Sequence, residues 1–186
     1  MENINKLIET LHLEKNITLE DIPNVDLYVD QVVQLFENNF GDTTRTADEK
    51  VLTKTMINNY AKGKLFIPIK NKKYSKEHMI LISLIYQLKG ALSINDIKSS
   101  LENINEKLLT ADAFELNTLY KNYLSLTESN VETFKKDVDN RVAEVKATSS
   151  LEDQEMEKFL LLTSFVSMSN MYRRLAEKLV DDLKES

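Results

Sequence analysis

The sequence predicts an all-α fold, and three observations predict it. Only 3 glycines and 2 prolines occur in 186 residues, which leaves few tight turns for a β-rich fold. Hydrophobic residues make up 42% of the chain, enough to build a core. Apolar residues recur at intervals of three and four along most of the sequence, as they do on one face of a helix.

The N-terminal quarter predicts two helices. We expect a short helix over residues 4–14, followed by a connector over residues 17–23 in which Pro23 stops any helix. Residues 26–40 are amphipathic, and Gly41 would close that helix. A polar loop over residues 42–48 follows.

A short helix is predicted over residues 53–62, with Thr53 as its N-cap and Gly63 as a left-handed C-terminal residue. Its core-facing side chains would be Met56, Ile57 and Tyr60. Residues 64–74 are too few, and too broken by Pro68, for a helix. We expect an extended hairpin or a loop with a lysine tip there.

Ser75 is expected to cap a helix that runs through Lys89 and ends at Gly90. Its side chains are apolar nearly all round, which predicts the central buried helix. The next helix opens with a capping box at Ser93 and Asp96 and runs to about residue 103. Its inward side chains would be Ile94, Ile97, Leu101 and Ile104.

The last 75 or so residues predict two long helices with a break at residues 148–150. Ser149 with Glu152, or Ser150 with Asp153, would cap the second, over residues 151–184. The apolar stripe of the first comprises Leu116, Tyr120, Tyr123, Leu124, Val131, Phe134, Val138, Val142 and Val145. The stripe of the second comprises Phe159, Leu162, Val166, Tyr172, Leu175, Leu179 and Leu183, widened by Leu160, Leu161, Phe165, Met168 and Met171.

The apolar surface between Met156 and Leu175 is wider than one neighbouring helix would cover. Two alternatives would bury it. One is a homodimer through the C-terminal helices, and the other is a helix bundle closed within one chain.

Charge is unevenly distributed along the chain, although the net charge is −6. Residues 1–49 carry 3 basic and 11 acidic side chains, whereas residues 50–89 carry 9 lysines and one acid, Glu77. Residues 90–186 carry 12 basic and 18 acidic side chains. A local excess decides binding because fields decay over about 8 Å at physiological salt.

This lysine-rich segment predicts contact with double-stranded DNA, since cations reach phosphates and polar side chains read base edges. Asparagine can bond adenine through two hydrogen bonds. A recognition helix over residues 53–62 and a basic wing over residues 64–74 would supply the contacts. The candidate DNA-binding residues are Lys54, Thr55, Asn58, Asn59, Lys62, Lys64, Lys70, Lys72, Lys73 and Lys76. The alternatives are a solvated surface without function and a non-catalytic protein-interaction module.

Nothing in the sequence predicts an enzyme. There is no cysteine, and the only two histidines, His12 and His78, lie far apart. No glycine-rich phosphate loop occurs, so we expect no cofactor and no metal site. His78 is expected on the surface. Without cysteines, a secretion signal or an apolar run of about 18 residues, a cytoplasmic location is expected.

Two families resemble the central part of the chain. Thr53 to Tyr60, then Gly63-Lys64-Leu65, Pro68 and Lys73-Tyr74-Ser75 resemble the winged helix-turn-helix of MerR-type transcriptional regulators. Leu92 to Lys98 is similar to the helix start that follows in those proteins. Across residues 19–109 the chain also resembles a bacterial family named domain of unknown function 1836. The matching strings are Ile22 to Tyr28, Leu52 to Tyr60 and Lys73 to His78.

The resemblance to the regulators implies DNA binding as a dimer through an antiparallel C-terminal helix. It carries over to Thr55, Asn58 and Tyr60 in the helix and to Lys72, Lys73 and Tyr74 in the wing, though Tyr60 could equally be core. Asn58 and Asn59 stand where the regulators have an arginine, and sensing by cysteines is excluded.

The predicted organisation has three parts. Residues 1–18 form an N-terminal helical arm, and residues 19–109 form a winged helix-turn-helix, MerR-like domain with a small β-wing. Residues 110–186 form a long C-terminal helical hairpin, which is the candidate dimerisation region.

Overall fold

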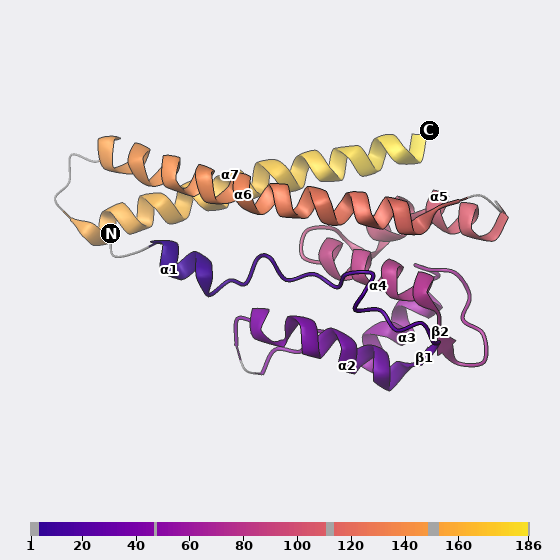
Figure 1. Ribbon diagram of the computed structural model, residues 1–186. Helices are drawn as coiled ribbons and strands as arrows, with labels where there is room; N and C mark the ends of the chain where they lie inside the picture. Colours follow the sequence, from indigo (N-terminus) through magenta and orange to yellow (C-terminus); the bar gives the residue numbers. More distant parts are fainter. Residues whose placement is uncertain (1–3, 47, 111–113, 149–152, 186) are drawn as a thin grey trace.

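The structure, a computed structural model, describes residues 4–46, 48–110, 114–148 and 153–185. It is mostly helical, as predicted, and two long antiparallel helices lie over the remaining elements (Figure 1). The elements are α1 (Ile4–Glu9), β1 (Leu27–Tyr28), α2 (Val29–Phe40), a 3-10 turn η1 (Gly41–Thr43), α3 (Lys54–Lys62), β2 (Lys73–Tyr74), α4 (Lys76–Leu88), α5 (Ile94–Thr110), α6 (Leu116–Thr148) and α7 (Gln154–Glu185).

The predicted central helix, α4, is confirmed at the centre of the core. Ile80, Leu81, Ile82 and Ile85 are fully buried, because α4 presents apolar side chains on every side. The core around it draws on α2, α3, α5 and the start of α6. Its other fully buried large side chains are Ile17, Phe36, Leu52, Ile57, Leu65, Tyr74, Met79 and Tyr120.

A two-stranded antiparallel sheet, absent from the predicted elements, joins the start of α2 to the segment before α4. Leu27 pairs with Tyr74, and Tyr28 pairs with Lys73. The helix expected from residue 26 therefore begins only at Val29, since residues 27–28 are extended. The predicted wing is a loop rather than a separate hairpin, and it adds only one isolated bridge, between Lys70 and Lys73.

The start of α3 is confirmed and its end differs from the prediction. The Thr53 side chain accepts the Met56 N–H at 3.1 Å, as an N-cap does. Gly63 was expected to be left-handed, but its φ is −72°, and Lys64 takes the left-handed conformation with φ 57°. The Leu65 N–H reaches the Tyr60 carbonyl at 3.0 Å and the Lys64 N–H reaches that of Ala61 at 3.1 Å. This pair of bonds is a Schellman motif centred one residue later than expected.

Gly63 is needed for space rather than for its backbone angles. A Cβ at this position would lie 2.8 Å from Leu65 Cδ1 and 3.2 Å from the Asn59 carbonyl oxygen. Leu65 is fully buried, so any shift of its side chain would disturb the packing of the core. We therefore expect Gly63→Ala to lower the free energy of unfolding by about 1–2 kcal/mol in urea titrations. Gly90→Ala, where a Cβ would meet nothing within 4 Å, is the matched control and should change stability little. Equal losses in the two variants would contradict this account.

Three predicted boundaries are corrected. The first helix ends at Glu9 rather than at residue 14, and α5 continues to Thr110 rather than to about residue 103. The Asp96 N–H donates to Ser93 Oγ at 3.2 Å, so Ser93 caps α5 as predicted. Ile94 was expected to face inward, yet 47% of it is exposed, because it lies in the first turn before α5 meets the core.

The long helix α6 joins the core at one end only. Tyr120 is buried and its hydroxyl donates to the Ile17 carbonyl at 2.6 Å, which ties α6 to the segment before β1. Of the predicted stripe, Leu116, Tyr120 and Val138 are buried, and Phe134 is 40% exposed. The predicted caps at Ser149 and Ser150 lie outside the described residues. Asp153 Oδ1 accepts the Glu155 N–H at 2.9 Å at the start of α7.

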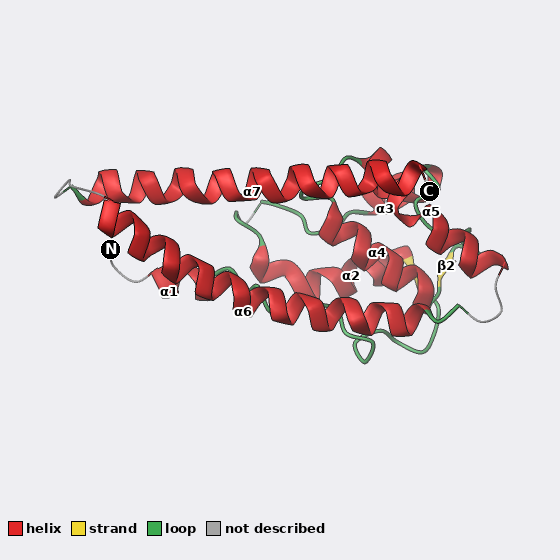
Figure 2. Cartoon of the chain, turned by 90° about the horizontal axis from the view of Figure 1, so that it is seen from above, coloured by secondary structure: helices red, strands yellow, loops and turns green. Residues whose placement is uncertain are grey.

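The helix α7 lies against α6 and α5 but leaves most of its predicted stripe exposed. Figure 2 shows that α6 and α7 diverge away from their connection. Leu161 and Leu179 are 18 residues, or five turns, apart and so share one helix face. Leu161 is 4% exposed beside α6, whereas Leu179 is 59% exposed. The uncovered part of this face, called here the C-terminal α7 patch, consists of Tyr172, Leu175, Leu179 and Leu183.

Candidate nucleic-acid interface

The exposed side of α3 carries the polar residues that the sequence singled out. Successive residues of a helix are 100° apart, so positions 54, 55, 58, 59 and 62 occupy one arc of about 140°. All five side chains are exposed, whereas Ile57 and Tyr60 on the opposite side are buried. We call this arc the α3 polar face. Its residues are Lys54, Thr55, Asn58, Asn59 and Lys62.

The loop after α3 ends in a tight turn that presents lysines to solvent. The Lys73 N–H donates to the Lys70 carbonyl at 2.9 Å, and the two residues between have φ 52° and 58°. Two positive φ angles within a four-residue turn define type I′, the turn that suits a right-twisted ribbon. Lys70, Asn71 and Lys72 are exposed on this turn. The predicted lysine tip is therefore a defined structure, called here the lysine turn.

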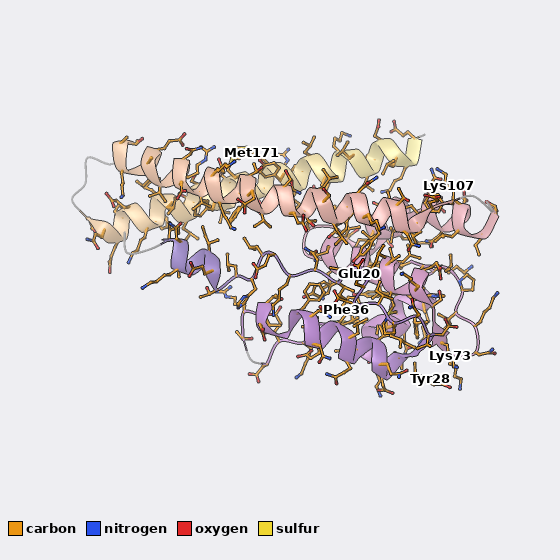
Figure 3. The ribbon with its side chains drawn as sticks, viewed as in Figure 1. Glu20, Tyr28, Phe36, Lys73, Lys107 and Met171 are labelled. Carbon is orange, nitrogen blue, oxygen red and sulfur yellow. The ribbon has the colours of Figure 1, made fainter. Side chains whose placement is uncertain are left out.

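The N-terminal end of α2 holds the α3 polar face and the lysine turn near each other. Asp30, in the first turn of α2, forms an ion pair with Lys54. Two residues earlier, the Tyr28 ring lies under the Lys73 ammonium, 5.2 Å from ring centroid to Nζ. Figure 3 shows Tyr28 and Lys73 together at one corner of the molecule. Because Lys54 begins α3 and Lys73 closes the turn, both parts of the surface border the same end of α2.

The structure separates other predicted site residues from this surface. Lys64 is exposed but lies at a cavity between α3 and α5. Lys76 is half-buried in the first turn of α4. Tyr60 and Tyr74, to which the regulator resemblance gave roles, are 6% and 2% exposed, so both belong to the core. Burial raises the pKa of each phenol.

Two exposed residues of this surface were not among the candidates. Asn71 occupies a left-handed position that asparagine tolerates better than most residues, so its place between lysines was a readable turn signal. Tyr28 is 53% exposed beside Lys73. No local signal could have found it, since its neighbour lies 45 residues further along the chain.

His78 was expected on the surface and is instead 4% exposed. Its Nδ1 accepts the Ser75 N–H at 3.0 Å, which leaves the proton on Nε2 to be donated to the Ile67 carbonyl at 3.1 Å. The neutral ring therefore joins the start of α4 to the loop before the lysine turn. Burial lowers the pKa of this imidazole, and the backbone hydrogen bond to Ile67 opposes that shift in part.

This burial predicts that acid destabilises the fold. The pKa of His78 is 6.5 in the unfolded chain and lower in the folded one, so below about pH 6.5 the unfolded chain binds more protons. The stabilising contribution is complete above pH 6.5 and is lost as the pH falls toward the folded pKa. We expect the melting temperature to decrease between pH 7 and pH 5. The His78→Gln variant should show a flatter profile over that range, and an equally steep one would contradict the prediction.

The described residues lack the features that a metal site and a membrane-spanning helix require. Within residues 4–46, 48–110, 114–148 and 153–185 no group of three or more histidines or carboxylates could hold a metal ion. Over the same residues no helix is both long and apolar enough to cross a membrane.

Fold and surface together define a mostly helical protein with a small two-stranded sheet and a basic surface at one end. Its chain belongs to the family described as Domain of unknown function (DUF1836), whose family model matches residues 17–123, more than half of the sequence. This match confirms the resemblance to that family. No curated protein and no solved structure matches the chain.

Proposed function

We propose that this protein is a DNA-binding transcriptional regulator that contacts duplex DNA through the α3 polar face and the lysine turn. The observation that carries the proposal is the shared position of these two parts at the N-terminal end of α2. Lys54 and Lys73 anchor there on Asp30 and Tyr28, two residues apart. One exposed surface therefore combines amides suited to base edges with ammonium groups suited to phosphates.

In this proposal α3 enters the major groove as the recognition helix of a winged helix-turn-helix, and the lysine turn lies on the flanking backbone. The order α3, projecting loop, β2 and α4 supports this arrangement. The connection from α2 to α3, residues 41–53, is longer than the three- or four-residue turn of most such motifs. In place of a tight turn, α2 and α3 contact each other directly, and the β1–β2 pairing ties the start of α2 to the end of the loop that follows α3.

The ion pair between Asp30 and Lys54 does not prevent Lys54 from contacting DNA. Exposed ion pairs contribute about 0–1 kcal/mol, so a phosphate can compete for Lys54. The side chains of the pair are 66% and 58% exposed, and both are reached by solvent.

We propose further that two copies act together through the C-terminal α7 patch. In the single chain α6 and α5 leave this patch exposed, with Tyr172, Leu175, Leu179 and Leu183 each 59–68% accessible. Four large apolar side chains on one helix face are rarely left in water by a monomer. In Figure 3, Met171 marks α7 on the side of the molecule away from Tyr28 and Lys73. A dimer would thus leave both DNA-contacting surfaces free, for half-sites roughly 34 Å apart.

The test of DNA binding is its salt dependence. Fluorescence anisotropy with a labelled random duplex of about 20 base pairs should show binding at 50 mM salt and a steep loss by 200 mM. If four to six lysines meet phosphates, the slope of log affinity against log salt is expected near −4 to −5. A protein that leaves the duplex unbound at 50 mM salt would overturn the proposal.

A further inference from the structure

A cavity of about 480 Å³ lies between the end of α3, the loop that follows it and α5. Its size falls in the range of about 300–1,000 Å³ that is typical of small-molecule sites. The proposed DNA contacts make no use of its interior. Its walls come from three parts of the chain: Ala61 and Lys64 at the end of α3, the four consecutive residues 66–69 of the loop, and Asn105 and Leu109 on α5.

The lining is apolar apart from two side chains. Phe66, Ile67, Pro68 and Ile69 form the loop wall, and Leu109 faces them from α5. Among the described lining residues, Lys64 alone is charged, and Asn105 supplies the only amide side chain. A cavity of this kind favours a ligand with an apolar body and a single anionic group.

The cavity is pre-formed, because its loop wall is held from both sides. Asn105 Nδ2 donates to the Leu65 carbonyl at 3.0 Å, and His78 Nε2 donates to the Ile67 carbonyl at 3.1 Å. Phe66, between the two acceptors, is only 5% exposed. A ligand that enters such a site does not have to order the loop first, so little binding free energy is lost.

Lys64 lies at the rim together with Leu109 and Pro68, and Phe66 forms the deepest part of the lining. Phe66 is 5% exposed, whereas Leu109 is 64% exposed and Lys64 and Pro68 are exposed as well. The left-handed backbone at Lys64, φ 57°, is fixed by the two hydrogen bonds of the Schellman motif. Its ammonium group can therefore meet an anion at the opening while the rest of the ligand is withdrawn from water.

We propose that this cavity binds a small amphipathic monocarboxylate, with its hydrocarbon part against residues 66–69 and its carboxylate on Lys64. A second charge on the ligand would have to enter the apolar interior without a partner, which disfavours dicarboxylates. Bound carboxylate neutralises Lys64, which lies outside the α3 polar face but only two residues after Lys62, so it lowers the positive charge at the end of that face. The ligand is thus expected to weaken DNA binding, and this consequence, unlike the site itself, rests on the proposed function.

Binding can be measured on the full chain with one reporter. The sequence contains no tryptophan, so Leu109→Trp places a single indole at the rim of the cavity. Titration with decanoate below its micelle concentration should change the indole fluorescence in a saturable way, with one site per chain. Decylamine has a chain of the same length with a positive head group and should bind at least about tenfold more weakly. Equal affinities for decanoate and decylamine would overturn the proposal.

Two further substitutions locate the site. Lys64→Gln in the reporter protein should weaken decanoate binding about fivefold, the upper end for an exposed ion pair. Lys62→Gln, two residues earlier and outside the lining, is the matched control and should leave decanoate binding unchanged. Ala61→Leu adds a larger side chain to the wall and should reduce binding still further. If Lys64→Gln binds decanoate as tightly as the reporter protein does, the ligand carboxylate does not lie on Lys64. This result holds whether or not Ala61→Leu folds.

The regulatory consequence has its own readout. Saturating decanoate should lower the affinity for labelled duplex about two- to fivefold at 50 mM salt, and in Lys64→Gln the same loss should need about fivefold more decanoate. Decanoate binding without an effect on DNA overturns the coupling. A protein that binds decanoate and no DNA overturns the proposed function while the cavity assignment stands.

Discussion

Replacing Lys70 and Lys72 by glutamate is expected to lower the affinity for duplex DNA about a hundredfold, roughly tenfold for each lysine. Both side chains are exposed on the lysine turn, and in the described structure neither forms a salt bridge. Each substitution removes one cation and adds one anion at the same place. The slope of log affinity against log salt should become shallower by about 2, because two phosphate contacts are lost.

Lys73 is left unchanged in this variant because its ammonium lies over the Tyr28 ring and its backbone pairs with β1. A matched control changes the net charge equally but elsewhere: Lys121→Glu with Lys136→Glu, both exposed on α6. Anisotropy titrations of the two double variants with the same duplex measure whether the position of the charge matters. Similar losses in both would mean that overall charge, rather than the lysine turn, governs binding. Retained affinity in the first double would remove the turn from the DNA contact.

The second large effect is expected at the C-terminal α7 patch. Leu175→Glu with Leu179→Glu should convert a dimer to monomers, with a loss of affinity between copies of at least about a hundredfold, since buried hot-spot leucines are replaced by charges. Sedimentation velocity over a range of protein concentrations measures this directly. An antiparallel pairing centred on Glu177 would place Leu175 of one copy opposite Leu179 of the other. Mixing this variant with Leu175→Lys, Leu179→Lys protein should then restore dimers.

Asn170→Glu is the control for that experiment. Asn170 and Leu179 are nine residues apart and therefore lie on opposite faces of α7, and both are exposed. The substitution should leave the dimer intact. A parent protein that sediments as a monomer would contradict the dimer, and a dimer broken by Asn170→Glu alone would move the contact to the other face. Circular dichroism verifies that each variant stays helical.

Features that depend on neighbours in the sequence could be predicted, and those that depend on distant ones could not. The helix of residues 76–88 was predicted because Ser75 caps it and its apolar side chains point in all directions. Thr53 was likewise readable as an N-cap. The β1–β2 pairing involves two residues on each strand, separated by more than forty positions, and leaves no periodic signal.

Similar reasons explain the errors. Glycine is the residue that best tolerates positive φ, so Gly63 was assigned the left-handed position. The buried Leu65 side chain requires a residue without Cβ at position 63, and the strained angle falls on Lys64. His78 was placed on the surface because its hydrogen-bond acceptor, the Ile67 carbonyl, comes from another element. Periodicity predicted α7 but could not indicate where α6 ceases to cover it.

Because α6 is attached to the core at one end, it can tilt as a rigid body about that end. Tyr120 fixes its start through the buried hydrogen bond to Ile17, and the remaining residues to Thr148 form a rod of about 42 Å. A tilt of about 5° at Tyr120 would displace the far end by roughly 4 Å, with no helix unwound. Small shifts in how α6 meets the core are thus amplified at its connection to α7. In a dimer such a shift would change the distance between the two basic surfaces, and therefore the spacing of half-sites that both can occupy.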